Sequence, residues 1–280
     1  MKRIAVATCS DLEIDVDTPQ TLAALRSAGL ETDFCVWDDP SVDWNSYDLT
    51  VVRSTWDYAT RRNEFLSWAR SVPRLLNPYE VIEYSTDKHY LHDVELRGHR
   101  IISSSFCDVG MTPAFPEGDF VVKPCVGAGS IGADRFSPSE HERATAHVAS
   151  LHEQGRDVLI QPYIDAIDTL GERALIFIDG ELSHAMTKGA MLNVAPDARD
   201  MIFRREQMSL ADPEPDAVEL ANDVLSSVGF SDLLYARVDL VKAQQGWSLM
   251  ELELVEPSLF ITYKPEAADL LATAVLKRLS

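Results

Sequence analysis

Short apolar runs alternate with helical patterns along the first third of the chain. Three runs have the length and apolar content of buried strands: RIAVAT (3–8), TDFCVW (32–37) and YDLTVVRS (47–54). Apolar residues recur at helical spacing in PQTLAALRSAG (19–29) and NEFLSWARSV (63–72). Strand and helix alternation of this kind is typical of a parallel sheet covered by helices, so the N-terminal third is predicted to be an α/β unit.

A further helix is predicted within residues 86–98, where apolar side chains again recur at helical spacing. Thr86 is a residue type that caps helix N-termini, and Gly98 is the type that most often follows a last helical turn. These two residues therefore set the predicted boundaries of the helix.

From Phe120 onward the pattern changes to strands in pairs. Asp179-Gly180 is a strong hairpin signal between two of them, and Gly246 marks another turn. A closing helix is predicted over residues 265–279, and PEGD (116–119) is the predicted boundary between the α/β part and this α+β remainder. The predicted pairs are FVVKP (120–124) with GADRF (132–136), RALIFI (173–178) with LSHAMTK (182–188), and YARVDLV (235–241) with WSLMELELV (247–255).

The amino-acid composition limits which kinds of partner the protein can bind. The chain has 280 residues, 46% of them hydrophobic, which is enough for a substantial core. Its net charge of −20 repels phosphate backbones and anionic lipids, so we expect neither nucleic acid nor membrane as a partner. No apolar run approaches the roughly 20 residues of a membrane span, and four scattered cysteines without a CxxC pair favour reduced thiols in a cytoplasmic protein. A small anionic ligand stays compatible with this charge if a divalent cation accompanies it.

Gly127, Gly129 and Gly132 have the GxGxxG spacing of a phosphate-binding loop. A dinucleotide-binding unit needs a helix at the third glycine and an acidic residue about 20 positions later. Here a short strand follows Gly132, and Gln161 stands where the acid is wanted, so that interpretation is disfavoured. A glycine hairpin that closes over phosphates fits better, because Lys123 ends the preceding strand; the alternative is a mobile surface hairpin. No HRD or DFG supports a protein kinase.

Acidic side chains gather on two late strands. The strand period of two puts Glu251 and Glu253 on one face, and Arg237 with Asp239 on one face of the preceding strand. Carboxylates packed this closely repel one another unless cations sit among them, and hard oxygen ligands suit Mg²⁺. The alternative is a solvated acidic sheet face. The opposite face is predicted to carry Met250, Leu252 and Leu254.

With VVKP, the glycine loop, LIQPYI, RVD and ELE in this order, the sequence resembles the ATP-grasp superfamily, which joins carboxylates to amines through acyl phosphates. The resemblance covers nearly the whole chain. Six further segments resemble the glutathione-synthetase-like branch, which includes a ligase that closes D-cycloserine from O-ureido-D-serine. These segments are RSTWDY (53–58), NP (77–78), DKHYL (87–91), GERALIF (171–177), SHAMTK (183–188) and ELELVEPSLF (251–260).

The resemblance implies an ATP-grasp fold of the α/β and α+β classes in three parts. Residues 1–85 would form an N-terminal α/β domain on the substrate side. Residues 86–165 would form the central subdomain with the glycine-rich lid, and residues 166–280 the C-terminal subdomain with the Mg²⁺ site. The two subdomains would clamp ATP between them.

For the nucleotide, the resemblance implies that Lys88 and Lys123 grip the α and β phosphates. The loop with Gly127, Gly129, Ser130 and Gly132 would cover the triphosphate. Adenine would bind at the segment that carries Gln161, Tyr163 and Ile164.

For the metal, the resemblance implies Asp239, Glu251 and Glu253 as Mg²⁺ ligands. The family pattern at the last site is Glu-x-Asn, so Glu253 departs from it, and Glu256 is an alternative ligand. Arg237 matches the family arginine that stabilises the transferring phosphoryl group. Arg173 and Lys188 are further catalytic candidates, whose alternative is a cross-strand ion pair with Glu172 or Glu181.

For the acid substrate, RSTWDY would lie at the carboxyl end of a strand, where ligands of α/β sheets collect. Arg53, Thr55, Trp56 and Asp57 are therefore predicted contacts, Asp57 for an amino group and Arg53 for a carboxylate. The alternative is a packed core in which Arg53 pairs with Asp57. His89 and His92 stand three apart, a spacing that permits a metal, although a solvated helix face is the better interpretation.

Together these features predict an ATP- and Mg²⁺-dependent carboxylate-nitrogen ligase that acts on a small amino acid derivative. The sharpest version is intramolecular cyclisation of O-ureido-D-serine to D-cycloserine. The alternatives are an intermolecular amino acid or dipeptide ligase and a nucleotide-binding protein without turnover. A homodimer is compatible with the chain, since dimers are the commonest assembly of soluble enzymes.

Overall fold

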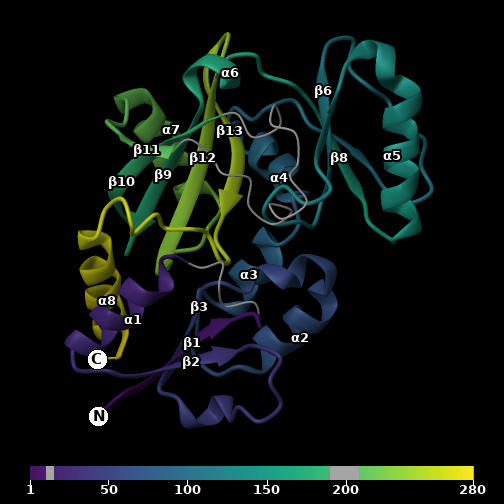
Figure 1. The fold of residues 1–280 in the computed structure, drawn as a ribbon. Helices are drawn as coiled ribbons and strands as arrows, with labels where there is room; N and C mark the ends of the chain where they lie inside the picture. The colour runs from purple at the N-terminus through teal and green to yellow at the C-terminus, as the bar shows by residue number, and fades with distance from the viewer. Residues whose placement is uncertain (11–15, 190–207, 280) are drawn as a thin grey trace.

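A computed structural model describes residues 1–10, 16–189 and 208–279 of the chain. Its described strands form three sheets, which lie in three consecutive stretches of sequence (Figure 1). Each sheet falls within one of the predicted segments 1–85, 86–165 and 166–280. The division into domains at those boundaries stays a prediction.

The first sheet is parallel and has the order β2-β1-β3-β4. Its central strand is fully buried from Ile4 to Ala7, because helices cover it and no side of it faces water. The strands and helices predicted for the first third of the chain are confirmed. These elements are β1 (Arg3–Thr8), α1 (Thr18–Ser27), β2 (Glu31–Val36), η1 (Trp44–Ser46), β3 (Leu49–Val52), η2 (Trp56–Thr60), α2 (Arg62–Ser71) and β4 (Leu75–Leu76).

The helix predicted over residues 86–98 is shorter than expected and follows another. Helix α3 spans Tyr79–Ser85, and Thr86 is its C-cap, so the N-cap prediction for Thr86 is wrong. The Thr86 hydroxyl is already engaged, since it donates to Glu83 O at 3.2 Å and accepts from Arg62 Nε at 2.8 Å. Helix α4 then spans Tyr90–Leu96, and Gly98 follows it with φ = 90°, as a C-terminal glycine does.

The second sheet is antiparallel, with the order β5-β8-β6-β7, and it stands with helix α5 as a separate lobe (Figure 1). Strand β5 pairs with β8, so PEGD (116–119) joins two strands of one sheet and the boundary predicted there is wrong. A capping box between Ser137 and Glu140 starts the helical segment that leads into α5. The elements are β5 (Ser105–Cys107), β6 (Phe120–Pro124), β7 (Asp134–Phe136), η3 (Pro138–Glu140), α5 (His141–Glu153) and β8 (Val158–Pro162).

The third sheet is antiparallel and has the order β11-β10-β9-β12-β13. Asp179 and Gly180 both have positive φ, 52° and 82°, as a type I′ hairpin turn requires, and the predicted β9-β10 hairpin is confirmed. The elements are α6 (Ile167–Leu170), β9 (Glu172–Ile178), β10 (Glu181–Lys188), β11 (Met208–Ala211), α7 (Pro215–Ser227), β12 (Tyr235–Ala243), β13 (Gly246–Glu253) and α8 (Glu266–Leu279).

Buried polar contacts join the first sheet to the third. The Asn77 amide donates to Tyr235 O at 2.9 Å and Leu254 O at 2.6 Å, and its oxygen accepts from Leu234 N at 2.7 Å. The Asp17 carboxylate accepts from Leu259 N at 2.9 Å. Helix α1 packs against α8, so the first and last helices lie side by side near both termini (Figure 1). The N-terminal unit is thus fixed to the C-terminal sheet.

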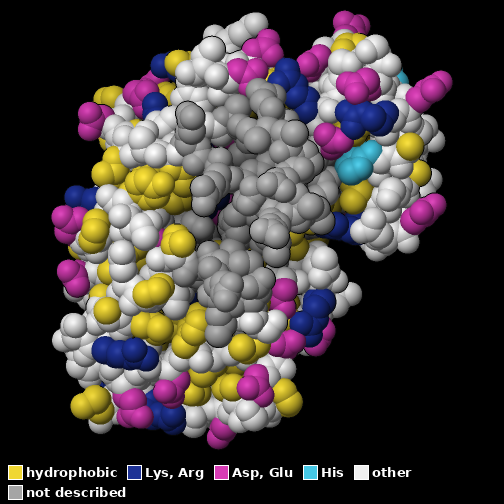
Figure 2. Space-filling model, in the orientation of Figure 1, with side chains coloured by type: hydrophobic (Ala, Val, Ile, Leu, Met, Phe, Trp, Pro, Cys, Tyr) yellow, Lys and Arg dark blue, Asp and Glu magenta, His cyan; other side chains and the backbone are white. Residues whose placement is uncertain are grey.

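Among the described residues on the face drawn in Figure 2, basic and acidic side chains are interspersed without one large patch of a single sign. In the part of the chain that the structure describes, no helix combines the length and the hydropathy that crossing a bilayer requires.

Candidate active site

A cavity of about 230 Å³ lies where the three sheets approach one another. Trp56 and Tyr58 line it from the N-terminal unit, Lys123 from the central sheet, and Arg237 and Glu251 from the C-terminal sheet. Thirteen of the predicted site residues line it. They are Trp56, Lys88, Lys123, Gly127, Gly129, Ser130, Gln161, Tyr163, Ile164, Lys188, Arg237, Glu251 and Glu253.

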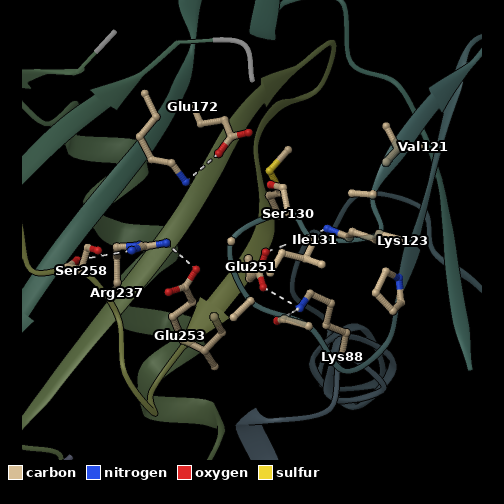
Figure 3. A pocket seen from close by; sticks show the side chains of 18 of the residues that line it. Lys88, Val121, Lys123, Ser130, Ile131, Glu172, Arg237, Glu251, Glu253 and Ser258 are labelled. Atoms are coloured by element: carbon tan, nitrogen blue, oxygen red, sulfur yellow. Dashed lines mark hydrogen bonds and ion pairs between the residues drawn. The ribbon is translucent and has the colours of Figure 1, made fainter. Parts of the chain in front are cut away.

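Lys88 and Lys123 lie on the same side of Glu251 (Figure 3). Lys88 Nζ lies 2.8 Å from Glu251 Oε1 and donates to Gly127 O at 3.1 Å, while Lys123 Nζ lies 4.0 Å from Glu251 Oε2. Burial opposes a charge on Lys88, but Glu251 more than offsets it, so the pKa of Lys88 is raised. Burial lowers the pKa of Lys123, whose carboxylate partner is more distant.

Hydrogen bonds to the edge of β13 bring Lys88 to this position. The Ser85 hydroxyl donates to Leu252 O at 3.1 Å, and Leu252 N donates to the Tyr90 hydroxyl at 2.7 Å. Because Leu252 follows Glu251 directly, these bonds hold the start of α4 beside the Glu251 carboxylate. Hydrogen bonds between side-chain hydroxyls and the backbone of β13 thereby fix an ion pair between two distant parts of the sequence.

The glycine loop between β6 and β7 has a backbone that few residues adopt. Gly129, Ser130 and Gly132 have φ of 60°, 60° and 80°, in the left-handed region that glycine enters without strain. Gly127 needs its missing side chain for another reason, since a Cβ there would lie 3.2 Å from Pro124 Cγ. Gly132 is the one predicted loop residue that does not line the cavity.

The charged face of β12 and β13 forms as the strand period predicts. Arg237 lies opposite Glu253, and Asp239 lies opposite Glu251. Arg237 donates to Asp239 through Nε at 2.9 Å and Nη2 at 3.0 Å. It also donates to Glu253, as Figure 3 shows. Lys188 Nζ lies 2.9 Å from Asp239 Oδ2. Asp239 itself lies behind these cations and does not line the cavity, so this is a buried charge network and the solvated-face alternative is wrong.

One detail of the strand alternation fails. The pairing register shifts between Asp239 and Leu240, which leaves Met250 as an extra residue on β13. A bulge of this kind re-aims the side chains next to it. Met250 consequently lines the cavity with Glu251, although the strict period of two put it on the other face. Leu252 and Leu254 are buried in the core on that other face, as predicted.

Burial and repulsion separate the pKa values of the cavity carboxylates. Burial raises the pKa of Glu251, but Lys88 and Lys123 outweigh it and bring the value to about 2. Burial and the charges of Asp239 and Glu251 raise the pKa of Glu253 to about 7, which Arg237 offsets only in part. Burial also opposes the charge of Asp239, yet Arg237 and Lys188 lower its pKa.

The oxygen donors fit a divalent cation. Glu251 and Glu253 line the cavity from one face of β13, and the pKa of Glu253 is raised first by burial and then by repulsion from Asp239 and Glu251. A divalent cation between the carboxylates would relieve this repulsion, and an all-oxygen set suits Mg²⁺. Asp239 acts on the set through Arg237 in this structure.

The other end of the cavity is more apolar. Ile102, Ile164 and Leu252 line it, and Gln161 is held by a hydrogen bond from Nε2 to Ser104 Oγ at 2.9 Å. The Arg135 guanidinium lies 3.5 Å from the ring centroid of Tyr163, which also lines the cavity. An apolar slot with an oriented amide suits a flat heterocycle such as adenine.

Arg173 does not line the cavity, contrary to the sequence prediction. Successive residues of a strand face opposite ways, and Glu172 is the one that faces the cavity. Arg173 donates to the Thr187 hydroxyl and to both oxygens of Glu214 at 3.2 Å. Its pairing alternative with Glu172 or Glu181 is therefore also wrong, whereas Lys188 does pair with Glu172 at 3.0 Å.

Only Trp56 of the four predicted substrate contacts lines the cavity. The Asp57 carboxylate accepts from Trp37 Nε1 at 2.8 Å and from Arg61 Nη1 at 3.3 Å, so its oxygens are engaged elsewhere. Thr55 is fully buried. Arg53 is buried and donates to Pro257 O at 2.9 Å, so the alternative pair with Asp57 is wrong too.

The two histidines after Asp87 do not share a site. His89 Nδ1 lies 2.6 Å from Asp87 Oδ1, whereas the acid near His92 is Glu95 at 3.9 Å. Potential ligand atoms of Asp87, His89 and Cys125 lie within 4.8 Å of one another, but the structure engages the histidine with the aspartate.

Several residues that line the cavity were not predicted from the sequence to belong to the site. Glu172 could have been found from the period of two, once Lys188 was placed opposite it on the neighbouring strand. Ser258 and Phe260 lie in irregular backbone after β13, where no periodicity points to a function. The others without a functional signal include Tyr58, Ser85, Ile102, Val121, Met208 and Val255.

Comparisons with known proteins agree with this geometry. Residues 4–77 match the family model described as the N-terminal domain of the D-cycloserine synthetase DcsG. The chain is 35% identical to the cycloserine biosynthesis protein DcsG of Streptomyces lavendulae, over 98% of this chain and 97% of that one. A crystal structure of D-cycloserine synthetase DcsG matches with a TM-score of 0.90 and 32% identity, over 99% of this chain and all of that one.

More distant structures share the fold. D-alanine--D-alanine ligase from Bacillus anthracis matches with a TM-score of 0.68 at 15% identity, over 100% of this chain and 97% of that one. The RimK domain ATP-grasp protein from Sphaerobacter thermophilus matches with a TM-score of 0.67 at 14% identity, over 98% and 99%. The ATP-grasp fold predicted from the sequence is confirmed.

Proposed function

This chain belongs to the D-cycloserine synthetase family, and from that membership we propose that it cyclises O-ureido-D-serine to D-cycloserine at the expense of ATP. Family membership makes it a ligase that forms carbon-nitrogen bonds. The observation that carries the proposal is the position of Glu251, 2.8 Å from Lys88 and 4.0 Å from Lys123 within one cavity. Ammonium groups for phosphates thus adjoin carboxylates for a divalent cation.

The nucleotide would bind with its phosphates toward Lys88 and Lys123 and its base toward Gln161. In this structure Glu251 is the carboxylate nearest to both ammonium groups, and a triphosphate would take its place as their partner. The glycine loop between β6 and β7 lies over the same cavity, with backbone N–H groups suited to phosphate oxygens. Mg²⁺, held by Glu251 and Glu253, would supply positive charge to the phosphate oxygens.

Arg237 is the group that we assign to phosphoryl transfer. Asp239 holds its guanidinium through two hydrogen bonds, at 2.9 and 3.0 Å, so it is oriented before any ligand arrives. A fixed, always charged donor stabilises charge that develops during the reaction without reorganising. Lys188 shares Asp239 and lines the same wall, so it would add a second fixed positive charge.

The reaction would run in two stages. The substrate carboxylate attacks the γ-phosphorus of ATP, which releases ADP and gives an acyl phosphate. The nitrogen bound to the side-chain oxygen of the same molecule then attacks the acyl carbon, and inorganic phosphate leaves. Because nucleophile and electrophile belong to one molecule, the protein gains most of the rate by positioning them. The carbamoyl group on that nitrogen passes to water as carbamate, which leaves the ring product.

The test measures ADP release with Mg-ATP and O-ureido-D-serine, beside a panel of D- and L-amino acids, with products identified by mass. Turnover with the ureido compound alone, giving D-cycloserine, is the expected result. ADP release that needs a second, separate amine would indicate an intermolecular ligase. Tight ATP binding without ADP release on any acid would contradict the proposal and favour a nucleotide-binding protein without turnover.

A further inference from the structure

We infer that the Glu256 carboxylate binds the α-ammonium group of the acid substrate and so determines that the enzyme accepts amino acids. The inference deepens the proposed function, on which it rests. It assigns a contact for which the sequence analysis expected Asp57.

Within the described part of the chain, Glu256 differs from the other acidic side chains of the cavity in having no partner. Glu251 pairs with Lys88, Glu253 with Arg237, and Glu172 with Lys188. Among the described residues, the Glu256 carboxylate has neither a hydrogen bond nor an ion pair, although the residue is only 8% exposed and lines the cavity. An ionised carboxylate this buried needs a cationic partner, and the cavity is where a ligand could bring one.

The backbone places Glu256 on the wall that the N-terminal unit contributes. The indole Nε1 of Trp56 donates to Glu256 O at 3.3 Å, and Trp56, Tyr58 and Val255 line the cavity beside it. Lys123, Gln161 and the glycine loop come from the central sheet, on the nucleotide side. The Glu256 carboxylate therefore lies on the side of the cavity where the acid substrate would bind, away from the proposed nucleotide side.

Electrostatics agree with a cationic ligand. Burial and the nearby charge of Glu253 raise the pKa of Glu256 to about 8, and Lys88, Arg237 and Arg53 offset this only in part. The pKa of Tyr58, which lines the same cavity, is raised well above its usual value by burial and by the charge of Glu256. A bound ammonium would favour ionised Glu256, so affinity for an amino acid should increase as pH rises from 6 to 8.

Such a contact would also select the nucleophile. An amino group held as an ammonium by a carboxylate has no free electron pair, so it cannot attack an acyl phosphate of a second molecule. The nitrogen next to the side-chain oxygen bears no positive charge and stays available. Recognition and ring closure would thus follow from one ion pair. Asp57 is not available for this contact, because Trp37 and Arg61 occupy its oxygens.

The experiment compares two ligands on two proteins. O-Ureido-D-serine and its analogue without the α-amino group are titrated into wild type and Glu256→Gln by calorimetry, in the presence of ADP and Mg²⁺. Wild type is expected to bind the amino compound at least tenfold more tightly than the analogue. The Gln variant is expected to lose that preference, while its affinity for the analogue and for ADP stays within twofold. Glu181→Gln, at an exposed hairpin end, is the matched control.

The Glu256→Gln variant is expected to fold. Replacing an unpaired buried carboxylate by a neutral amide of the same shape should leave the thermal midpoint unchanged or raise it. Glu256→Asp, which keeps the charge but withdraws it by one methylene, should keep part of the preference and serves as the second variant.

The outcomes separate this inference from the proposed function. If Glu256→Gln still prefers the amino compound as strongly as wild type does, the inference is overturned while the cyclase function stands. If the ureido compound is not a substrate but another acid of the panel is, the same comparison is made between that amino acid and its deaminated form. Loss of the preference in the variant then supports the inference alone. A wild type that binds no amino-bearing acid would overturn it.

Discussion

The two sides of the cavity neutralise their charges in different ways. Arg237, Lys188 and Asp239 all belong to the C-terminal sheet, and their ion pairs of 2.9 Å stay within it. The Arg237–Asp239 pair lies along β12, and the Lys188–Asp239 pair reaches from β10 across β9 to β12. Lys88 and Glu251 come from separate parts of the fold, and hydrogen bonds at the edge of β13 bring them together. The ion pairs within the C-terminal sheet fix the positions of Arg237 and Lys188 before a ligand binds. The Lys88–Glu251 pair, in contrast, occupies the positions that phosphate and metal would take.

The largest expected effect is on the pairs within the sheet. Asp239→Ala removes the carboxylate that Arg237 and Lys188 share and leaves two buried cations without it. Breaking a buried ion pair from one side costs about 3–5 kcal/mol of stability. Urea unfolding of the variant beside Asp223→Ala, on the exposed face of α7, measures the loss. A loss below about 1 kcal/mol, as at surface pairs, would remove the distinction between the two sides.

Arg237→Lys sharpens the comparison at the level of catalysis. The substitution keeps the charge but loses the planar fork that Asp239 holds, so kcat should fall about 10²-fold with little change in KM for ATP. Arg173→Lys is the matched control on the other face of the same sheet, and it should stay within about threefold of wild type because Arg173 does not line the cavity. Equal losses in the two variants would contradict the assignment of Arg237.

Lys123→Met tests the side of the cavity where Lys88 and Lys123 would exchange Glu251 for the phosphates of ATP. The substitution should weaken ATP binding by at least the ~1.5 kcal/mol of a charge-assisted hydrogen bond, about tenfold in affinity. Stability should not fall, because burial opposes the charge of Lys123. Calorimetry with a non-hydrolysable ATP analogue gives the affinity, and Lys242→Met, at an exposed position of β12, is the control. Unchanged affinity would exclude Lys123 from the phosphate site.

A further expected effect is in the pH dependence of stability. The pKa values of Glu253 and Glu256 are raised to about 7 and about 8, so between pH 5 and 8 the folded state binds more protons than the unfolded state does. Stability should therefore decrease as pH rises through that window. Glu256→Gln should flatten the slope, as urea unfolding at pH 5, 6.5 and 8 would show. A steeper slope in the variant would contradict the raised pKa of Glu256.

Glu251 acts in the opposite direction and in another window. Its pKa is lowered to about 2, so its contribution to stability is complete above the unfolded value of about 4.3 and is lost as pH falls toward 2. The two windows do not overlap, which allows the paired and the unpaired carboxylate to be followed separately in one protein.

The regular helices and strands could be predicted because the repeat of apolar positions determines which face of each element is buried. The β12-β13 pair shows this best, since a period of two is enough to place Arg237, Glu251 and Glu253 on one face. The prediction failed where the backbone leaves its period. The bulge opposite Asp239 turned Met250 toward the cavity, and the C-cap role of Thr86 depended on α3, which the sequence pattern did not reveal.

Side-chain partners across the fold were the other limit. Arg173 was chosen over Glu172 although only one of two successive strand residues can face a cavity, and the choice depended on Glu214 of a distant segment. Asp57 was expected to contact the substrate, but its carboxylate accepts hydrogen bonds from Trp37 and Arg61. Such competition between partners is tertiary, so a single sequence does not encode it locally.

The most direct test of the account follows an oxygen atom. O-Ureido-D-serine labelled with ¹⁸O in its carboxylate is turned over with Mg-ATP, and the inorganic phosphate is analysed by mass. An acyl phosphate intermediate transfers one carboxylate oxygen to the phosphate, so one ¹⁸O atom should appear in the phosphate for each ring that closes. Ring closure with unlabelled phosphate would contradict the central claim, that this cavity joins the carboxylate of the substrate to the phosphoryl group of ATP before the nitrogen attacks.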